Sequence, residues 1–101
     1  MQIAYLLVQS QMAENDEKDI YKLTLNTSKK LTLSYSSRLE NVELYIYDRD
    51  GKVVWNGYGS KDRESGLNII KEQISLSAGT YYFVVDKKWN STGPYTFVFY
   101  K

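Results

Sequence analysis

Large apolar side chains alternate with other residues in two runs near the end of the chain, residues 81–85 and 95–99. Side chains point to opposite faces of a strand with a period of two, so each run predicts a strand that turns one apolar row toward a core. The two inward rows are Tyr81, Phe83 and Val85, and Tyr95, Phe97 and Phe99. We expect both strands at the centre of one sheet.

Three further strands are predicted in the first third of the chain. Residues 3–8 are apolar at both parities, which is typical of a short strand buried on both sides or an edge strand under a loop. Residues 20–25 and 30–35 each place leucine and tyrosine on one side and mostly polar residues on the other. We expect these two strands to be neighbours in one sheet.

The middle of the chain predicts a hairpin and then a less regular strand. Val42, Leu44 and Ile46 form another inward row, and residues 48–51 (DRDG) predict the turn that closes the hairpin. Residues 57–66 are charged and glycine-rich, and predict a solvated loop. From residue 67 onward Ile70, Ile74 and Leu76 share a parity that Glu72 interrupts, which favours an irregular strand, with a short helix at 67–73 as the alternative.

The number and spacing of these segments define the fold class. Seven or eight short strands, separated by turn signals and without a helix-length amphipathic run, predict an all-β protein. The architecture that fits is an antiparallel two-sheet β-sandwich. At 101 residues, with no internal repeat, we expect a single domain spanning residues 1–101.

Composition narrows the function classes. The chain has no cysteine and no histidine, so it cannot build a thiolate metal site, a cysteine nucleophile or a Ser-His-Asp triad. The carboxylates lie in turn-like or solvated segments, and we expect no catalytic activity. With 13 basic and 12 acidic residues, the chain has no cationic excess for nucleic acid or an anionic membrane, and no apolar run reaches membrane-span length.

Tyrosines on the outward parity are the candidate binding residues. Most outer sheet faces are polar, whereas the outward residues of the tyrosine-rich strands are Tyr45, Tyr47, Tyr82, Val84, Val98 and Tyr100. Tyrosine binds partners with little loss of conformational entropy, so we predict a ligand-binding role for Tyr45, Tyr47, Tyr82 and Tyr100. The alternatives are that cross-strand tyrosine pairs only stabilise the sheet, or that residues 3–8 or a neighbouring domain cover them.

Three segments of the chain carry a family resemblance. They are DIYKL at 19–23 with Asp16 before it, LYIYD at 44–48 with Gly51 and Val53-Val54 after it, and AGTYY at 78–82 followed by Val84-Val85, Gly93, Tyr95 and Phe97. In this order the segments resemble the bacterial pre-peptidase C-terminal domain, the family to which the collagen-binding domains of clostridial collagenases are related. The resemblance implies a jelly-roll-like sandwich.

A calcium site is a further candidate. Glu14, Asn15, Asp16 and Asp19 bring four oxygen-bearing side chains into six residues, and hard cations prefer such ligands. In the collagen-binding relatives, calcium is held by an acidic pair like Asp16 and Asp19 and by an acidic segment ahead of the domain. Residues 1–11 here contain no carboxylate, so we expect the Glu14, Asp16 and Asp19 site to be incomplete. The alternative is a solvated loop.

The resemblance also implies a function and a location. It indicates a non-catalytic accessory module of a larger secreted or cell-surface bacterial protein, which attaches that protein to an extracellular protein matrix or spaces its domains. A carbohydrate-binding module, with polysaccharide as the partner, would use the same exposed tyrosines. The third hypothesis is a purely structural spacer, whose tyrosines are covered by neighbouring domains of the parent chain. The first residues lack the basic start of a signal peptide, so the location rests on the resemblance.

Overall fold

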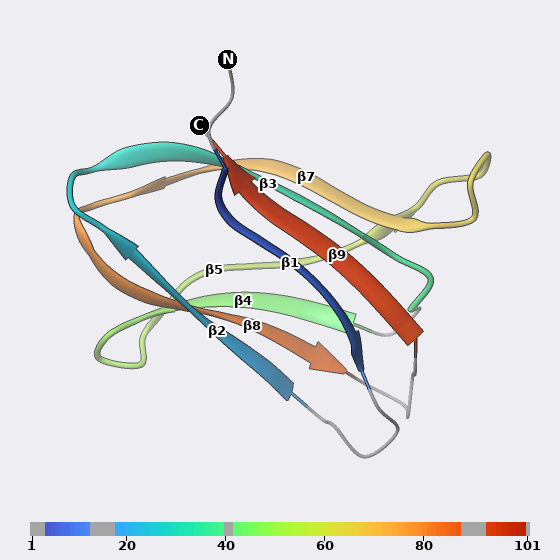
Figure 1. Ribbon diagram of the computed structural model, residues 1–101, viewed down its shortest axis with the longest axis horizontal. Coiled ribbons are helices and arrows are strands. Elements are labelled where there is room, and N and C mark those ends of the chain that lie inside the picture. Colours follow the sequence, from blue (N-terminus) through green and yellow to red (C-terminus); the bar gives the residue numbers. More distant parts are fainter. Residues whose placement is uncertain (1–3, 13–17, 40–41, 88–92, 101) are drawn as a thin grey trace.

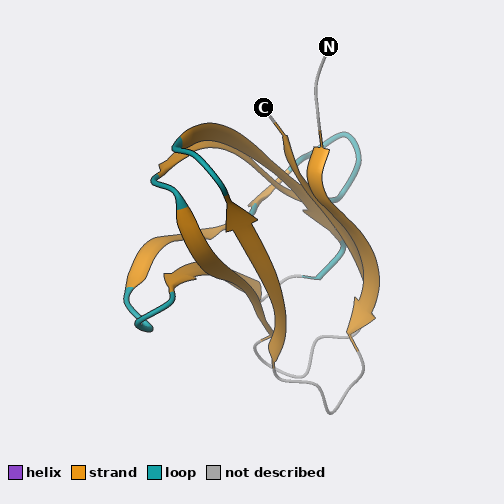
Figure 2. Cartoon of the chain, turned by 60° about the vertical axis from the view of Figure 1, so that its left-hand side comes forward, coloured by secondary structure: helices purple, strands orange, loops and turns teal. Residues whose placement is uncertain are grey.

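The computed structural model describes residues 4–12, 18–39, 42–87 and 93–100, which form nine antiparallel strands in two sheets (Figure 1). Figure 2 shows strands and loops, and no helix, in this part of the chain. The five-stranded sheet has the order β1 (Ala4–Met12), β9 (Gly93–Tyr100), β3 (Lys29–Ser37), β7 (Asn68–Leu76) and β6 (Ser60–Lys61). The four-stranded sheet has the order β2 (Lys18–Leu25), β8 (Gly79–Lys87), β4 (Val42–Asp48) and β5 (Val53–Tyr58).

The strand order is that of a jelly roll. The chain crosses from one sheet to the other at every connection except two. This path produces the strand orders β1-β9-β3-β7 and β2-β8-β4-β5. The exceptions are the hairpins β4–β5 and β6–β7, and the two-residue β6 extends the first sheet at its edge. An eight-stranded double sheet of this kind is the jelly-roll architecture, which confirms the predicted all-β sandwich.

Strand pairing differs from the sequence-based prediction in two places. The apolar rows of residues 81–85 and 95–99 do not share a sheet, because β8 lies between β2 and β4 whereas β9 lies between β1 and β3. The strands of residues 20–25 and 30–35 also lie in opposite sheets. Alternation specifies the face that a side chain occupies and carries no information on the neighbouring strand, so a crossover and a hairpin look alike in sequence.

The core lies where the inward rows of both sheets meet, as the alternation predicts. The largest side chains with almost no exposed surface are Tyr95, Phe83, Phe97, Phe99, Leu31, Leu33, Leu44, Ile46 and Val85. The rings of Phe83 and Phe97 lie 4.6 Å apart between β8 and β9, and Phe83 meets Phe99 edge to face at 5.1 Å. Aromatic pairs at these separations add to the free energy gained by burying apolar surface.

The segment from residue 57 to residue 76 is more regular than predicted. β5 continues to Tyr58 and β6 begins at Ser60, so the solvated loop predicted for residues 57–66 is reduced to residues 62–67. Asp62 closes this turn by accepting hydrogen bonds from the backbone N–H and hydroxyl of Ser65, and Gly66 has a positive φ of 73°. Residues 68–76 form strand β7, as favoured over the helix.

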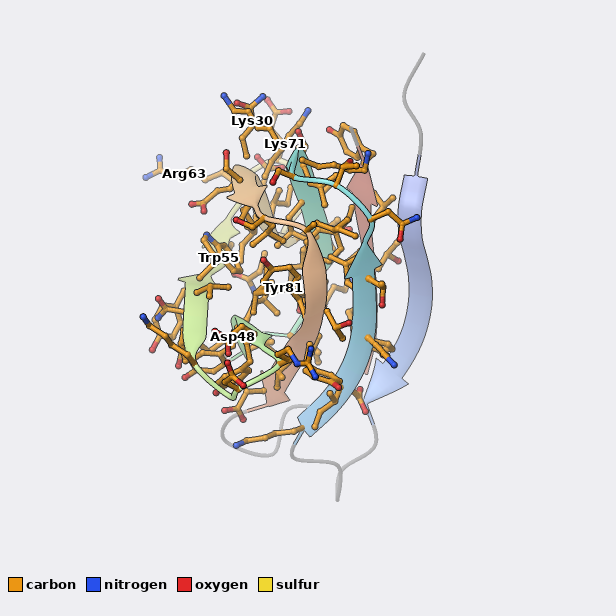
Figure 3. The ribbon with its side chains drawn as sticks, turned by 90° about the vertical axis from the view of Figure 1, so that its left-hand side faces the viewer. Lys30, Asp48, Trp55, Arg63, Lys71 and Tyr81 are labelled. Atoms are coloured by element: carbon orange, nitrogen blue, oxygen red, sulfur yellow. The ribbon has the colours of Figure 1, made fainter. Side chains whose placement is uncertain are left out.

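Glu72 interrupts the inward row of β7 because of a contact between the sheets. Its carboxylate accepts a hydrogen bond of 2.9 Å from the indole Nε1 of Trp55, which extends from β5 (Figure 3). Trp55 packs on the core from the edge of the four-stranded sheet. Glu72 has the parity of the inward row but is exposed, and it joins β7 to β5 where the sandwich is open.

Tyr81 and Tyr82 are adjacent residues on opposite faces of β8, and their substitutions should differ in cost. Tyr81 is 8% exposed and donates a 2.9 Å hydrogen bond to the carbonyl of Ser77, so Tyr81→Ala should lower the free energy of unfolding by about 3–5 kcal/mol. Tyr82 lies on the outer face, and Tyr82→Ala should cost about 1 kcal/mol or less. Urea unfolding of both variants tests this, and equal costs would contradict the assignment of faces.

Burial of Tyr35 predicts a loss of stability at high pH. Desolvation raises the pKa of its phenol from 10 to about 12, although a hydrogen bond with Ser37 opposes the shift. The unfolded phenol releases its proton first, so the free energy of unfolding should fall as the pH rises from 10 to about 12. Because Tyr35→Phe removes the titrating phenol, the free energy of unfolding of this variant should fall by about 2–3 kcal/mol less over the same pH range. Urea unfolding at a series of pH values measures the difference. The control is Tyr82→Phe, which removes a hydroxyl from the outer face of β8, and an equally steep decline in the two variants would contradict the prediction.

Candidate functional site

The outer face of the four-stranded sheet gathers apolar and aromatic side chains on three adjacent strands. Tyr47 on β4 lies directly opposite Tyr82 on β8, and Val84 on β8 lies opposite both Tyr45 on β4 and Ile20 on β2. These residues point outward because their chain neighbours in the same strands fill the core. The structure therefore brings together three of the four tyrosines predicted to bind a ligand.

A shallow cavity of about 440 Å³ opens on this face, and we call it the tyrosine groove. Its lining residues are Lys18, Ile20, Tyr47, Asp48, Arg49, Gly51, Tyr82 and Val84. Val84 is only 4% exposed and lies at the bottom of the groove, whereas Ile20 is 63% exposed and projects from β2 at the side of the groove. The volume is within the range of about 300–1,000 Å³ typical of small-ligand pockets.

One end of the tyrosine groove is set by the β4–β5 turn. Asp48 lies at this turn (Figure 3). Its carboxylate accepts hydrogen bonds of 2.9 Å from the backbone N–H groups of both Asp50 and Lys52. Gly51 takes a positive φ of 84°, a conformation that costs other residues energy. Asp48 therefore has the predicted role of a turn residue, and the hydrogen-bonded turn places Arg49 in the lining of the groove.

Tyr45 supports the groove from the side of β5. Its ring stacks on that of Tyr47, with centroids 5.7 Å apart. A hydrogen bond from its hydroxyl to the Glu43 carboxylate, with smaller contributions from burial and from the charges of Glu43 and Asp86, raises the pKa of Tyr45. Glu43 is 6% exposed and also accepts a hydrogen bond from Asn56, so Tyr45 is held in place and presents its ring to Tyr47.

The fourth predicted ligand-binding residue, Tyr100, lies elsewhere. It projects from β9 opposite Thr32, on the outer face of the five-stranded sheet. There it lines a separate cavity of about 460 Å³ with Thr32, Lys71, Glu72 and Gln73. The four tyrosines therefore do not form one surface, because β8 and β9 belong to different sheets.

The sequence-based prediction missed Lys18, Ile20 and Arg49 as lining residues of the groove. Ile20 carried a signal, since it is an apolar residue on the outward parity of a strand whose other outward residues are Lys22 and Thr24. Arg49 carried none, because its position depends on how the turn folds back along the sheet. Strand order decides which outward residues become neighbours.

Of the three residues predicted to bind calcium, only Asp19 lies among the described residues; Glu14 and Asp16 lie outside them. The Asp19 carboxylate accepts a hydrogen bond of 2.7 Å from the hydroxyl of Tyr95. That hydroxyl has one proton and also bonds the hydroxyl of Tyr21, so Tyr21 is the donor in the second bond. Asp19 thus ends a hydrogen-bonded chain that joins the two sheets.

The described residues contain no cluster of three or more carboxylate, histidine or cysteine side chains suited to a metal ion. Nor do they include a helix with the length and apolar character needed to span a membrane.

Comparisons with known proteins agree on the fold. The family model of the bacterial pre-peptidase C-terminal domain matches residues 17–87, which include strands β2 to β8. Among solved structures, the chain resembles the pre-peptidase C-terminal domain of collagenase from Bacillus anthracis with a TM-score of 0.76 and 16% sequence identity. This match covers 94% of the chain and 88% of that domain. No curated protein matches the chain.

Calcium should bind this chain weakly. Asp19 is already engaged with Tyr95, and residues 1–11 supply no carboxylate. Ligands that bind only the folded state raise the melting temperature by mass action, so micromolar free Ca²⁺ should leave it nearly unchanged. A large increase that is abolished by Asp19→Asn would show that the chain holds a complete site. Mg²⁺ at the same concentration serves as the control.

Proposed function

Because the chain belongs to the family of bacterial pre-peptidase C-terminal domains, we propose that it is a non-catalytic accessory module that attaches a larger secreted protein to a protein matrix. The observation that carries this proposal is the tyrosine groove. It is an open, mainly apolar depression, with Tyr47 and Tyr82 as cross-strand neighbours above the buried Val84. The solved relative is a domain of a collagenase, and this makes collagen the first matrix protein to test.

The chemistry of the groove suits an extended polypeptide. Tyrosine rings supply a large contact area and lose few rotatable bonds on binding, and the stacked pair Tyr45–Tyr47 is already ordered. The groove is open along the sheet surface, so a chain can lie across β2, β8 and β4 with one side chain over Val84. Lys18 and Arg49 line the groove as well, and they offer hydrogen-bond donors to backbone carbonyls.

The absence of histidine and cysteine from the sequence supports a non-catalytic role. A hydrolase built on carboxylates needs a pair that flanks a cleft. In the part of the chain that the structure describes, the buried carboxylates are Glu43 and Asp86, which face each other across β4 and β8. Neither lines the tyrosine groove. Glu43 is occupied by hydrogen bonds from Tyr45 and Asn56, so its role is to support the groove.

Binding to an insoluble matrix tests the proposal. The purified chain should sediment with fibrillar collagen, and Tyr47→Ala or Tyr82→Ala should weaken this binding by about tenfold or more, as expected for central aromatic residues of an interface. Tyr100→Ala is the matched control, because it removes a tyrosine from the outer face of the other sheet. Its affinity should equal that of the unchanged chain. Urea unfolding of each variant confirms that the fold is retained.

Other results would select a different function. Binding to cellulose or chitin, but not to collagen, with the same loss in Tyr82→Ala would assign the groove to polysaccharide. An equal loss in Tyr100→Ala and Tyr82→Ala would contradict a site confined to the groove. Failure to bind any of these matrices would favour a spacer whose tyrosines are covered by neighbouring domains of the parent protein.

A further inference from the structure

Strand β5 is an unprotected edge of the four-stranded sheet. Its sequence, VVWNGY, contains no charged residue and no proline. Val53 and Val54 are each 43% exposed and Tyr58 is 67% exposed, so three of the five most exposed large apolar side chains of the described residues lie on this one strand. Alternate residues of an edge strand point their N–H and C=O groups away from the sheet, where another strand can pair with them.

The opposite edge of the same sheet has the protection that β5 lacks. β2 carries Lys18 and Lys22 on its outer side and Asp19 on its inner side. Charged side chains on an edge strand oppose pairing with a further strand, because pairing would bring them out of water. The five-stranded sheet has two edges: β6 has two residues and includes Lys61, and β1 has nine residues, AYLLVQSQM, without a charge. β5 is thus the uncharged edge of the four-stranded sheet, the sheet that carries the tyrosine groove.

β5 is also held in a conformation that is ready to pair. The indole of Trp55 is fixed by its hydrogen bond to Glu72, and it lies over Gly57, where a Cβ atom would come within 2.9 Å of the ring. On the other face, the side-chain amide of Asn56 donates a 3.3 Å hydrogen bond to Glu43. Both contacts are made by side chains on the faces of the sheet, and no described strand pairs with the outer edge of β5, so pairing requires little additional ordering.

We propose that β5 pairs antiparallel with β5 of a second copy of this chain, so that two four-stranded sheets form one continuous sheet. A two-fold axis through Asn56 preserves the faces of the sheet and puts Val54 of each copy opposite Tyr58 of the other. Pairs of an aromatic and a β-branched residue are favourable across strands. Because β5 is uncharged, no like charges meet across the contact. Each copy contributes the same surface, the outer edge of its own β5.

The dimer gives the binding module two sites. A two-fold axis perpendicular to the sheet leaves both tyrosine grooves on the same side of the joined sheet, and this consequence rests on the proposed function. A six-residue strand pair buries less surface than the roughly 1,200–2,000 Å² of stable interfaces, so the dimer is weak. Weak pairing still strengthens attachment to a matrix that presents many sites, because the second groove binds at a high effective concentration.

Sedimentation equilibrium of the chain over about a hundredfold range of concentration tests the dimer, since a weak dimer dissociates on dilution. The weight-average mass should rise from that of one chain toward that of two. Val54→Lys introduces a charge on the edge and should lower the association constant by about tenfold or more, with no change in the urea unfolding midpoint. Ile20→Lys is the matched control, because it places the same charge at an exposed apolar position on the opposite edge. It should leave association unchanged.

A disulfide trap locates the two-fold axis. The chain has no cysteine, so a single introduced cysteine reports one position. Asn56→Cys should form an interchain disulfide under mild oxidation much faster than Thr24→Cys on β2, because only the first places two thiols across a strand pair.

The outcomes separate the dimer from the groove. Association that is lost in Val54→Lys, together with rapid crosslinking of Asn56→Cys, supports pairing through β5. A single-chain mass at every concentration, association insensitive to Val54→Lys, or equal crosslinking rates for the two cysteine variants would overturn it. Ile20→Lys changes a lining residue of the tyrosine groove. If this variant loses collagen binding but still forms the dimer, the groove and the β5 edge act separately, and each proposal can be judged on its own.

Discussion

The packing of β8 against β9 across the core is the constraint on which the rest of the structure depends. Each is flanked by strands on both sides within its own sheet, and their inward rows meet at Phe83, Phe97 and Phe99, which have no exposed surface. A shift of either strand by one residue would exchange its buried and outward rows. The burial of Phe83 therefore also determines that Tyr82 and Val84 face outward, where the tyrosine groove forms.

The faces of the strands could be predicted from the sequence, and the pairing of the strands could not. Tyr81, Phe83 and Val85 are buried as their alternation indicates, because side-chain direction is a local property of an extended chain. Pairing depends on loops that either close a hairpin or cross the sandwich, and the two kinds share the same turn residues. For this reason the alternation predicts a single sheet for β8 and β9, and it groups Tyr100 with tyrosines that lie on the other side of the molecule.

The same limit applies to the candidate site. Tyr47 and Tyr82 could be predicted as outward residues from their parity, but their direct opposition across β4 and β8 required the register. Glu43 also has an outward parity and is nevertheless 6% exposed. Its burial follows from the hydrogen bonds of Tyr45 and Asn56, which come from its own strand and from β5. Parity identifies a face, whereas exposure on that face depends on the sizes and contacts of neighbours.

The two unlike edges of the four-stranded sheet allow its two proposed contacts to coexist. The tyrosine groove lies over β2, β8 and β4, next to the edge that carries Lys18 and Lys22, so a bound chain stays on the sheet face and has little tendency to add as a further strand. β5 lines no part of this groove, and its free edge points away from β4. A partner in the groove and a strand at β5 therefore use different chemistry, side-chain contacts in one case and backbone hydrogen bonds in the other. Because neither surface includes residues of the other, occupation of one leaves the other open.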